Sequence, residues 1–227
     1  MMLPLLRIIY GVVFCLGAVL SWSAQALDSN QLAVVVNTQD PLSVQIGEYY
    51  AKQRHILFQN YIKVSFPSGS TTLTREEFGR IKAEVGNKTL PHIQAYALTW
   101  AAPYRVECMS ITTAFAFGFD PAFCASGCKP TRTSPYFNSS ARLPYRQLGM
   151  RPTMAIAATS FENAKALIDR GVESDGSMPT GTTYLLSTSD TSRNVRSALY
   201  PLVDKLIKGR VPVRLLTAIA YADVVDP

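Results

Sequence analysis

Residues 32–66 read LAVVVNTQDPLSVQIGEYYAKQRHILFQNYIKVSF, and this stretch decides the fold class. The β-branched run at 32–36 predicts a buried strand, since short apolar runs of this kind are typical of parallel sheets. Asp40 can cap a helix that begins with proline and continues over residues 41–54. Residues 61–66 then predict a second strand. The order strand, helix, strand indicates an α/β layer.

The rest of the chain repeats this alternation of apolar runs and helical patterns. Thr74 and Glu77 have the spacing of a capping box, which predicts that a second helix begins after Thr74. Further strands are predicted over residues 93–100, 153–158, 183–187 and 215–222. Further helices are predicted over residues 161–170, closed by Gly171, and 191–208, kinked at Pro201. We therefore predict an α/β fold, a three-layer sandwich with a mostly parallel sheet of about six strands.

Residues 103–150 interrupt this pattern and predict an irregular insert. The segment 109–119 is apolar but alternates poorly, so it is either a buried strand or a short helix. The remainder is rich in proline, aromatic and small polar residues, which favour loops. Basic residues gather in and just after the insert: Lys129, Arg132, Arg142, Arg146 and Arg151. A solvated basic loop is the simplest interpretation, and an acidic glycan or other anionic partner is the functional alternative.

Residues 1–26 have the organisation of a secretory signal peptide. Arg7 supplies a positive charge, residues 8–20 are apolar, and residues 23–26 match the small-residue pattern that signal peptidase recognises. The apolar run is about thirteen residues long, shorter than the ~20 residues of a membrane-spanning helix. We expect cleavage after Ala26 and a single α/β domain over residues 27–227. The protein would then be exported, periplasmic or secreted, with no membrane span after signal removal.

The composition of the chain is that of a folded globular protein. Hydrophobic residues make up 48% of the sequence and charged residues 17%, so disorder is not expected. The formal net charge of +6 is a modest excess. Because export removes the protein from most nucleic acid, we predict no nucleic-acid partner. The partner that we expect instead is an envelope protein or an acidic glycan, and an anionic lipid is a further alternative.

In open α/β sheets, ligands bind beyond the carboxyl ends of the strands, where loops and helix N-termini converge. Four polar residues are expected at that edge: Asn37, Asp40, Arg105 and Asp190. Both aspartates also have a sufficient structural role as helix caps. Together with Arg142 and Arg146 of the insert, these residues are the candidate binding residues.

Three cysteines remain after signal removal: Cys108, Cys124 and Cys128. An oxidising compartment favours a disulfide between two of them, and the sequence leaves the pairing open. Cys108 is also a candidate nucleophile, because a guanidinium such as that of Arg105 stabilises the reactive thiolate form.

Neither of the two histidines is expected beside Cys108. His92 precedes the third strand and therefore lies at the opposite edge of the sheet. His55 ends the first helix, where it interacts favourably with the helix dipole.

A zinc site usually needs a second pair of ligands besides Cys124 and Cys128, and the sequence offers none. We predict no metal and no cofactor.

Several segments resemble an uncharacterised family of exported bacterial proteins found mainly in genomes with exosortase-type protein sorting. The matching positions are residues 34–37, 43–54, Asn60, 103–106 and 151–154. The resemblance covers most of residues 31–222 and implies the fold and an exported address, but no activity. Family members continue for roughly a further half-domain, so the resemblance also suggests that the C-terminus is truncated.

The first strand, the first helix and the strand after Asn60 are also similar to the start of the caspase-like cysteine peptidases. Those enzymes carry a His-Gly pair after the third strand and a cysteine after the fourth. This sequence has residues 101–103, Ala-Ala-Pro, at the first place and Ser160 at the second. The catalytic dyad of that family is therefore missing.

Two functional hypotheses follow. The first is a non-catalytic binding or accessory protein of the cell envelope, which uses the aromatic and basic residues of the insert: Tyr104, Tyr136, Phe137, Arg142, Tyr145 and Arg146. The second is a hydrolase with a cysteine or serine nucleophile on a caspase-like α/β scaffold.

Overall fold

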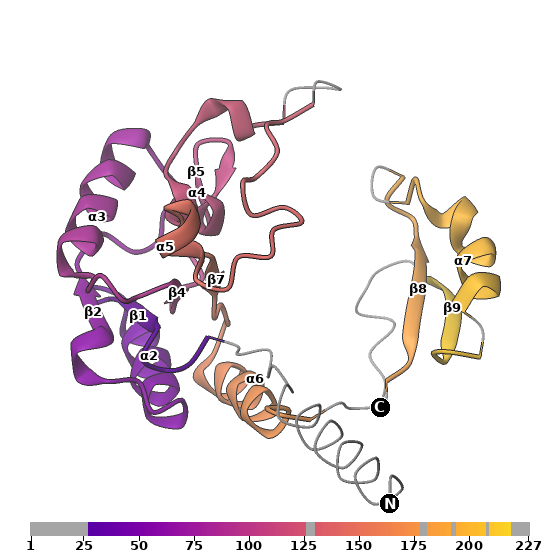
Figure 1. The fold of residues 1–227 in the computed structure, drawn as a ribbon, viewed down its shortest axis with the longest axis horizontal. Helices are drawn as coiled ribbons and strands as arrows, with labels where there is room; N and C mark the ends of the chain where they lie inside the picture. Colours follow the sequence, from indigo (N-terminus) through magenta and orange to yellow (C-terminus); the bar gives the residue numbers. More distant parts are fainter. Residues whose placement is uncertain (1–26, 126–129, 178–180, 192–193, 208, 219–227) are drawn as a thin grey trace, which may run out of the picture. The chain divides into compact units, whose positions relative to one another are not determined.

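The computed structural model describes residues 27–125, 130–177, 181–191, 194–207 and 209–218 (Figure 1). The predicted signal peptide, Cys128, Lys129 and the end of the strand predicted over 215–222 lie outside these described residues. The chain divides into two compact units, the first ending at Val172 and the second beginning at Glu173. The mixed α/β class predicted from the sequence is confirmed.

The first unit is built on a parallel sheet of four strands in the order β2-β1-β4-β7. The strands are β1 (Leu32–Asn37), β2 (Tyr61–Val64), β4 (Ala95–Leu98) and β7 (Thr153–Ala155). Within the sheet, Val35 of β1 lies beside Ile62 of β2 and Leu98 of β4. Because the strands are parallel, all four carboxyl ends meet at one edge, which is where α/β proteins place their ligands.

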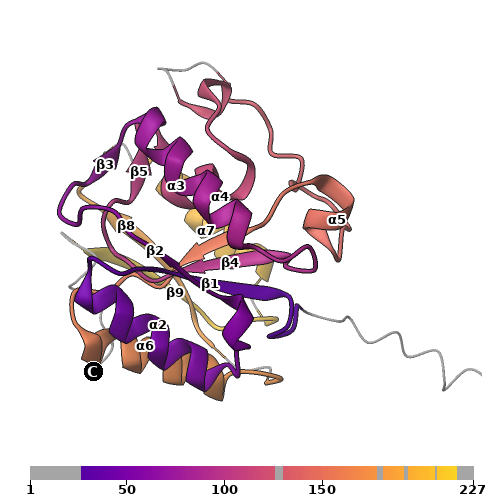
Figure 2. The same cartoon turned by 90° about the vertical axis from the view of Figure 1, so that its left-hand side faces the viewer.

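Helices cover both faces of this sheet, as Figure 2 shows. On one face lie α2 (Pro41–Gln53) and α6 (Phe161–Glu173), and on the other lie α3 (Arg75–Lys88) and α4 (Ile111–Phe117). The covering explains why five consecutive residues of β1 are fully buried: Ala33 and Val35 pack against α3 and α4, while Val34 and Val36 pack towards α2 and α6.

The insert is more regular than the sequence predicted. A small three-stranded sheet joins β3 (Thr72–Leu73), β5 (Arg105–Val106) and β6 (Met109–Ser110). The segment 109–119, interpreted as either a strand or a short helix, contains helix α4, whose Phe115 is fully buried. Two short helices follow, η2 (Pro121–Phe123) and α5 (Pro144–Leu148). The apolar residues of α4 alternate poorly because they face the core at helical spacing.

The second unit contains two parallel strands, β8 (Thr183–Thr188) and β9 (Val213–Ala218). Between them in the chain lie η3 (Ser197–Leu199) and α7 (Tyr200–Ile207). This order of strand, helix and parallel strand is the βαβ arrangement expected of an α/β chain.

Two helix predictions are wrong in detail. The helix predicted over 191–208 begins as an α-helix only at Tyr200, so Pro201 lies in its first turn, where a missing N–H costs no hydrogen bond. Helix α6 continues through Gly171 to Glu173. Gly171 instead makes room for Arg54, since an added Cβ would lie 3.2 Å from Arg54 Nη2.

In the part of the chain that the structure describes, every helix is too short or too polar to cross a bilayer.

Candidate functional site

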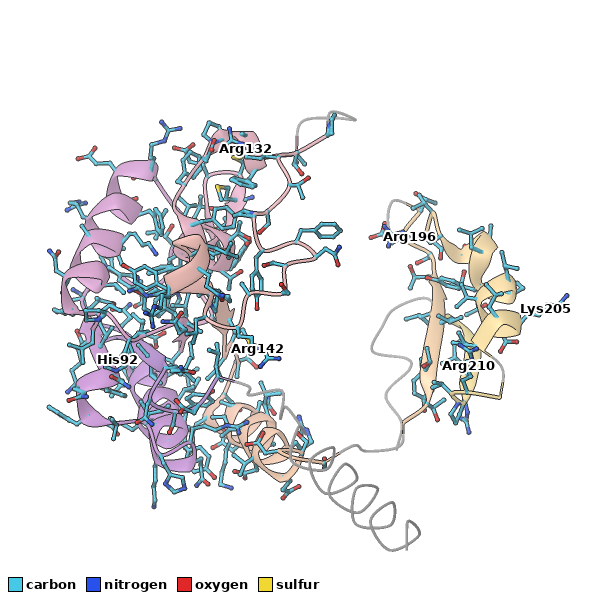
Figure 3. The ribbon with its side chains drawn as sticks, viewed as in Figure 1. His92, Arg132, Arg142, Arg196, Lys205 and Arg210 are labelled. Atoms are coloured by element: carbon cyan, nitrogen blue, oxygen red, sulfur yellow. A yellow bond between two sulfur atoms is a disulfide. The ribbon has the colours of Figure 1, made fainter. Side chains whose placement is uncertain are left out.

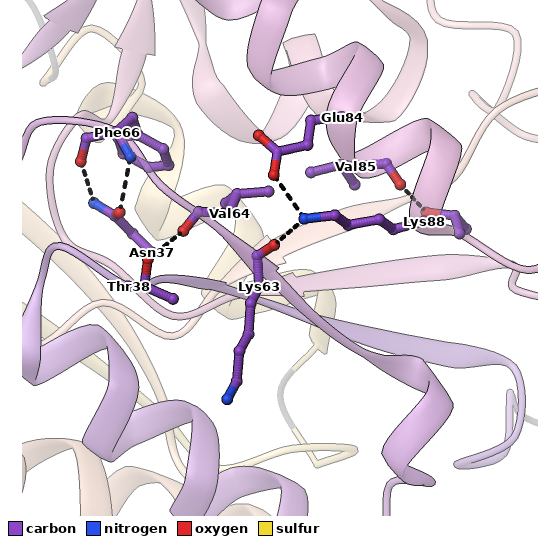
Figure 4. Close-up of polar contacts among 9 residues, drawn as sticks. Asn37, Thr38, Lys63, Val64, Phe66, Glu84, Val85 and Lys88 are labelled. Atoms are coloured by element: carbon purple, nitrogen blue, oxygen red, sulfur yellow. Dashed lines mark hydrogen bonds and ion pairs between the residues drawn. The ribbon is translucent and has the colours of Figure 1, made fainter.

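The carboxyl edge of the sheet is organised around Asn37, the last residue of β1 (Figure 4). Its side-chain amide donates to the carbonyl oxygen of Phe66 at 3.0 Å, and its Oδ1 accepts from the Phe66 N–H at 3.2 Å. The same Oδ1 accepts from the backbone N–H of Gln39. Asn37 is fully buried, and its amide therefore replaces strand pairing at the point where β1 and β2 separate.

Two hydroxyl groups continue this buried network. Ser43 Oγ accepts from the backbone N–H of Asn37 at 3.0 Å and lies 2.8 Å from Thr99 Oγ1. Thr99 Oγ1 also donates to the Ser43 carbonyl oxygen at 2.9 Å. The first turn of α2 is thereby tied to the ends of β1 and β4. Ser43 is held in structural hydrogen bonds rather than presented as a nucleophile.

The predicted edge residues are only partly brought together. Asp40 lies next to Asn37 and caps α2, accepting from the Leu42 N–H at 3.0 Å. Arg105 lies in the small sheet, where its Nε donates to Thr72 Oγ1 at 2.7 Å. Asp190 belongs to the second unit. Asn37 and Asp40 thus share the carboxyl edge, and both have structural roles there.

A hollow of about 340 Å³ lies beside the carboxyl end of β2. Its lining residues come from the segment after β2, from β3 and from α3: Ser65, Phe66, Pro67, Leu73, Glu77, Arg80, Ile81 and Glu84. Glu77 accepts from Thr74 in a capping box, as predicted, and this hydrogen bond to the backbone holds the pKa of Glu77 below its ordinary value. Glu84 pairs with Lys88 at 2.6 Å. The carboxylates of the hollow therefore serve α3 and its surroundings rather than a bound substrate.

Lys88 has a second partner that explains its position. Its Nζ donates to the backbone carbonyl of Lys63 at 2.7 Å, so the side chain reaches from α3 to the edge strand β2 (Figure 4). An edge strand presents unpaired backbone groups that can pair with other chains. Lys88 donates a hydrogen bond to one of these groups, the Lys63 carbonyl.

A disulfide joins Cys108 to Cys124, with the two Cα atoms 5.5 Å apart. Cys108 lies in the turn between β5 and β6, and Cys124 follows η2. The bond connects the small sheet to the segment that follows η2. A cysteine in a disulfide is not a thiolate, so Cys108 in this state is no nucleophile.

Both histidines are exposed and lie apart from the carboxyl edge. His92 precedes β4, at the amino end of that strand (Figure 3), and its carbonyl accepts from Gln94 Nε2. His55 follows α2 with a φ of 53°. The serine and cysteine candidates therefore have no histidine beside them to act as a base.

The insert exposes both aromatic and basic side chains. Phe137 is 74% exposed and Tyr104 53% exposed. Arg142, which is labelled in Figure 3, and Arg146 are exposed as well. Tyr145 differs, because the Arg151 guanidinium stacks on its ring at 3.2 Å from the centroid. Of the predicted insert residues, Tyr145 is thus committed to packing, and the others remain available at the surface.

Lys82 is a partly buried cation that was not predicted from the sequence. Its Nζ donates to the Phe115 carbonyl near the end of α4 and lies 5.3 Å from the centroids of both the Tyr96 and Phe115 rings. Burial, with a smaller contribution from Arg151, lowers the pKa of Lys82 to about 8. The signal was present in the sequence, since Lys82 follows Phe78 by four residues on the apolar face of α3.

The charge of Lys82 is balanced without a carboxylate. The last carbonyl groups of a helix carry a partial negative charge, and aromatic faces attract cations. Arg151 contributes in the same place: its backbone N–H donates to the Ala116 carbonyl, and its Nε donates to Ile93. The arrangement therefore stabilises the C-terminus of α4 against the core.

Within the described ranges, no three side chains of His, Cys, Asp or Glu lie close enough together to hold a metal ion.

Comparison of the chain with protein-family models, with curated proteins and with solved structures found no match. The resemblance to an exported bacterial family and the similarity to caspase-like peptidases stay predictions from the sequence.

Proposed function

We propose that this protein is an exported, non-catalytic binding or accessory protein of the bacterial cell envelope. The observation that carries the proposal is the surface of the insert, where exposed Tyr104, Tyr136 and Phe137 accompany exposed Arg142 and Arg146. Aromatic rings that stack on sugars or side chains, with arginines that pair with anions, are suited to an acidic glycan.

The polar residues at the carboxyl edge support this proposal indirectly. Asn37, Ser43 and Thr99 have their hydrogen-bonding groups engaged with the backbone or with each other. Cys108 is engaged in a disulfide. The hydrolase alternative would need one of these groups to be free and activated, and no contact among the described residues favours it.

The proposal is tested by binding to polygalacturonate, an acidic glycan. Replacing both insert arginines, Arg142→Gln with Arg146→Gln, should weaken retention about a hundredfold, because each charged hydrogen bond contributes on the order of 1.5 kcal/mol. Arg80→Gln is the matched control, since Arg80 is an exposed arginine on α3.

Equal retention of the double variant, the control and the parent protein would reject the insert as the binding surface. If the arginine substitutions weaken binding to an envelope protein extract but not to polygalacturonate, the partner is a protein instead of a glycan.

We also propose that β8 and β9 extend the four-stranded sheet beyond β7 into the six-stranded sheet predicted from the sequence. Support comes from β7, which is the last strand in the order of its sheet and whose Met154 is 74% exposed. The Tyr96 N–H donates to the Pro152 carbonyl, and the Ile156 N–H donates to the Leu98 carbonyl. Because backbone groups alternate in direction along a strand, the Ala155 N–H faces the open edge of β7.

Amide hydrogen exchange at Ala155 tests this extension. Strong protection in the parent chain, lost in Leu185→Pro of β8, is the expected result. Exchange at the rate of a loop in the parent chain would contradict it.

A further inference from the structure

Phe58 is the most exposed large apolar side chain among the described residues, with 91% of its surface accessible. Its neighbour Leu57 is 43% exposed. Both lie in the connection between α2 and β2, at the amino end of the sheet. A single exposed apolar residue is common, so the surroundings of Phe58 decide whether it has a role.

The segment that carries Phe58 is held firmly. Phe58 begins the short helix η1 (Phe58–Asn60), and the Ile56 N–H donates to the Ala51 carbonyl at 2.9 Å. Asn60 is buried, and its side-chain amide donates to the Asn30 carbonyl at 3.0 Å. Phe58 is therefore presented to solvent by an ordered element rather than by a loose loop.

Phe58 is one of the residues that line a hollow of about 380 Å³ between α2 and β2. The lining combines apolar and charged residues: Glu48, Ala51, Lys52, Ile56, Phe58, Tyr61 and Lys63. The Tyr61 hydroxyl is buried here without a hydrogen-bond partner, and burial raises the pKa of Tyr61 to about 12. Two exposed lysines, Lys52 and Lys63, face this surface. We call Leu57, Phe58, Lys52 and Lys63 the Phe58 patch.

The Phe58 patch lies beside the first described residues of the chain. Asn60 binds the carbonyl groups of Ser29 and Asn30, so the first residues after Ala26 run beside η1. The apolar run at 8–20 precedes them in the sequence. The described residues that follow the predicted leader therefore lie beside the Phe58 patch.

We infer that the Phe58 patch rests on the surface of an anionic phospholipid bilayer, with Phe58 and Leu57 at the boundary of headgroups and acyl chains. Lys52 and Lys63 then face lipid phosphates. An aromatic ring with neighbouring basic residues is the composition that interfacial membrane contacts use. This inference is independent of the glycan proposal, which concerns the insert.

A bilayer fits the patch better than a protein partner. A phenylalanine buries on the order of 200 Å², whereas a stable protein interface needs about 800 Å² from each partner. A ring that is 91% exposed can enter a fluid bilayer without a matching pocket. Glu48, which lines the same hollow, opposes part of the positive charge, which predicts weak and salt-sensitive binding.

The first experiment places a reporter at the patch in the full chain. Phe58→Trp should show fluorescence quenching by brominated phosphatidylcholine in vesicles containing phosphatidylglycerol, beyond the quenching of the parent protein. Phe137→Trp, at a 74% exposed aromatic position of the insert, is the control and should show none beyond the parent. No excess quenching for Phe58→Trp would overturn the inference.

The second experiment measures co-sedimentation with the same vesicles. Phe58→Ser should weaken binding about tenfold, and Lys52→Gln or Lys63→Gln about fivefold each, because one lysine near an anionic surface contributes about 1 kcal/mol. Lys205→Gln, an exposed lysine of α7, should bind like the parent. Unchanged binding of the patch variants, or burial of the Phe58→Trp reporter by self-association without vesicles, would overturn the inference.

Discussion

Asn37 shows how a polar residue at the mouth of an α/β sheet can serve the fold alone. Its side chain binds both backbone groups of Phe66, and its backbone N–H binds Ser43. Leaving such buried groups unpaired costs about 1–3 kcal/mol each, so the asparagine is required where β1 and β2 diverge. A polar residue at this edge of the sheet has either a structural role or a ligand-binding role. Only its hydrogen-bond partners distinguish the two.

Gly47 is required because α2 packs closely against β1 and Tyr61 at this position. A Cβ added at Gly47 would lie 2.4 Å from Val36 Cγ2 and 3.0 Å from Tyr61 Oη. Gly47→Ala should lower the free energy of unfolding by about 1–3 kcal/mol, because α2 must move away from β1. Urea denaturation measures the change.

The control for this prediction is Gly79→Ala. Gly79 is an exposed residue within α3, and an added Cβ would meet nothing within 4 Å. Alanine is the better helix former by about 1 kcal/mol, so this variant should be slightly more stable than the parent. Equal effects of the two substitutions would contradict the packing argument.

Lys82 predicts a dependence of stability on pH. Its pKa in the folded protein is about 8, below the ordinary value of 10.5, so between these values the unfolded chain binds more protons than the folded one. The free energy of unfolding should therefore rise with pH in this interval, by about 1–2 kcal/mol between pH 8 and pH 10. Above about pH 10, the raised pKa of Tyr61 acts in the opposite direction.

Lys82→Met separates this contribution from all others. It keeps the packing of the side chain and removes the titrating group, so its stability should lack the rise between pH 8 and pH 10. Denaturation curves at several pH values provide the measurement. Parallel pH profiles for the variant and the parent would show that Lys82 does not titrate in this range.

Among the elements, the insert depends most on a covalent bond. Only short elements occur in its described part, and the disulfide between Cys108 and Cys124 closes a loop of 16 residues in sequence separation. Around this loop, the ring centroids of Phe117 and Phe123 lie 4.4 Å apart, and Arg132 forms a salt bridge with Asp120. Within the insert, the disulfide therefore fastens the segment that follows α4 to the turn of the small sheet.

Removing the disulfide, by Cys108→Ser with Cys124→Ser, should lower the free energy of unfolding by about 3 kcal/mol, the value for a loop of this length. Peptide mapping of the unreduced parent protein should yield a linked pair of peptides containing Cys108 and Cys124. A linked pair containing Cys128 with either of them would contradict the pairing.

The whole molecule consists of two compact units that differ in how much they bury. In the first, both faces of the sheet are covered, and residues 33–36 are 0% exposed. In the second, Leu199, Leu202 and Leu206 are each more than half exposed. A pair of strands with one covering helix buries little apolar surface by itself, so we expect the first unit to provide most of the stability.

Export is the prediction that belongs to the complete chain. If the leader predicted from the sequence is removed, mass spectrometry of the exported protein should find Leu27 at the N-terminus. An intact Met1 on protein recovered from the envelope would show that the leader is retained. The Phe58 patch lies beside Ser29 and Asn30, which follow the predicted cleavage site closely.

The sequence by itself determined the α/β class, the order of β1, α2, β2 and α3, and the capping box of α3. These features depend on residues that are close in the chain: a β-branched run, Asp40 before a proline, and Thr74 three residues before Glu77. Such local patterns bias the backbone before any distant contact forms.

Only the tertiary structure decided what the polar and reactive residues do. Asn37 donates a hydrogen bond to Phe66, 29 residues away in the sequence, and Lys82 donates one to Phe115, 33 residues away. The pairing of Cys108 was open in the sequence because spacing permits several disulfides and geometry permits few. Residues far apart in the chain meet only after the sheet and helices have packed, so hydrogen-bond partners and exposure, which separate structural from functional residues, are properties of the folded molecule.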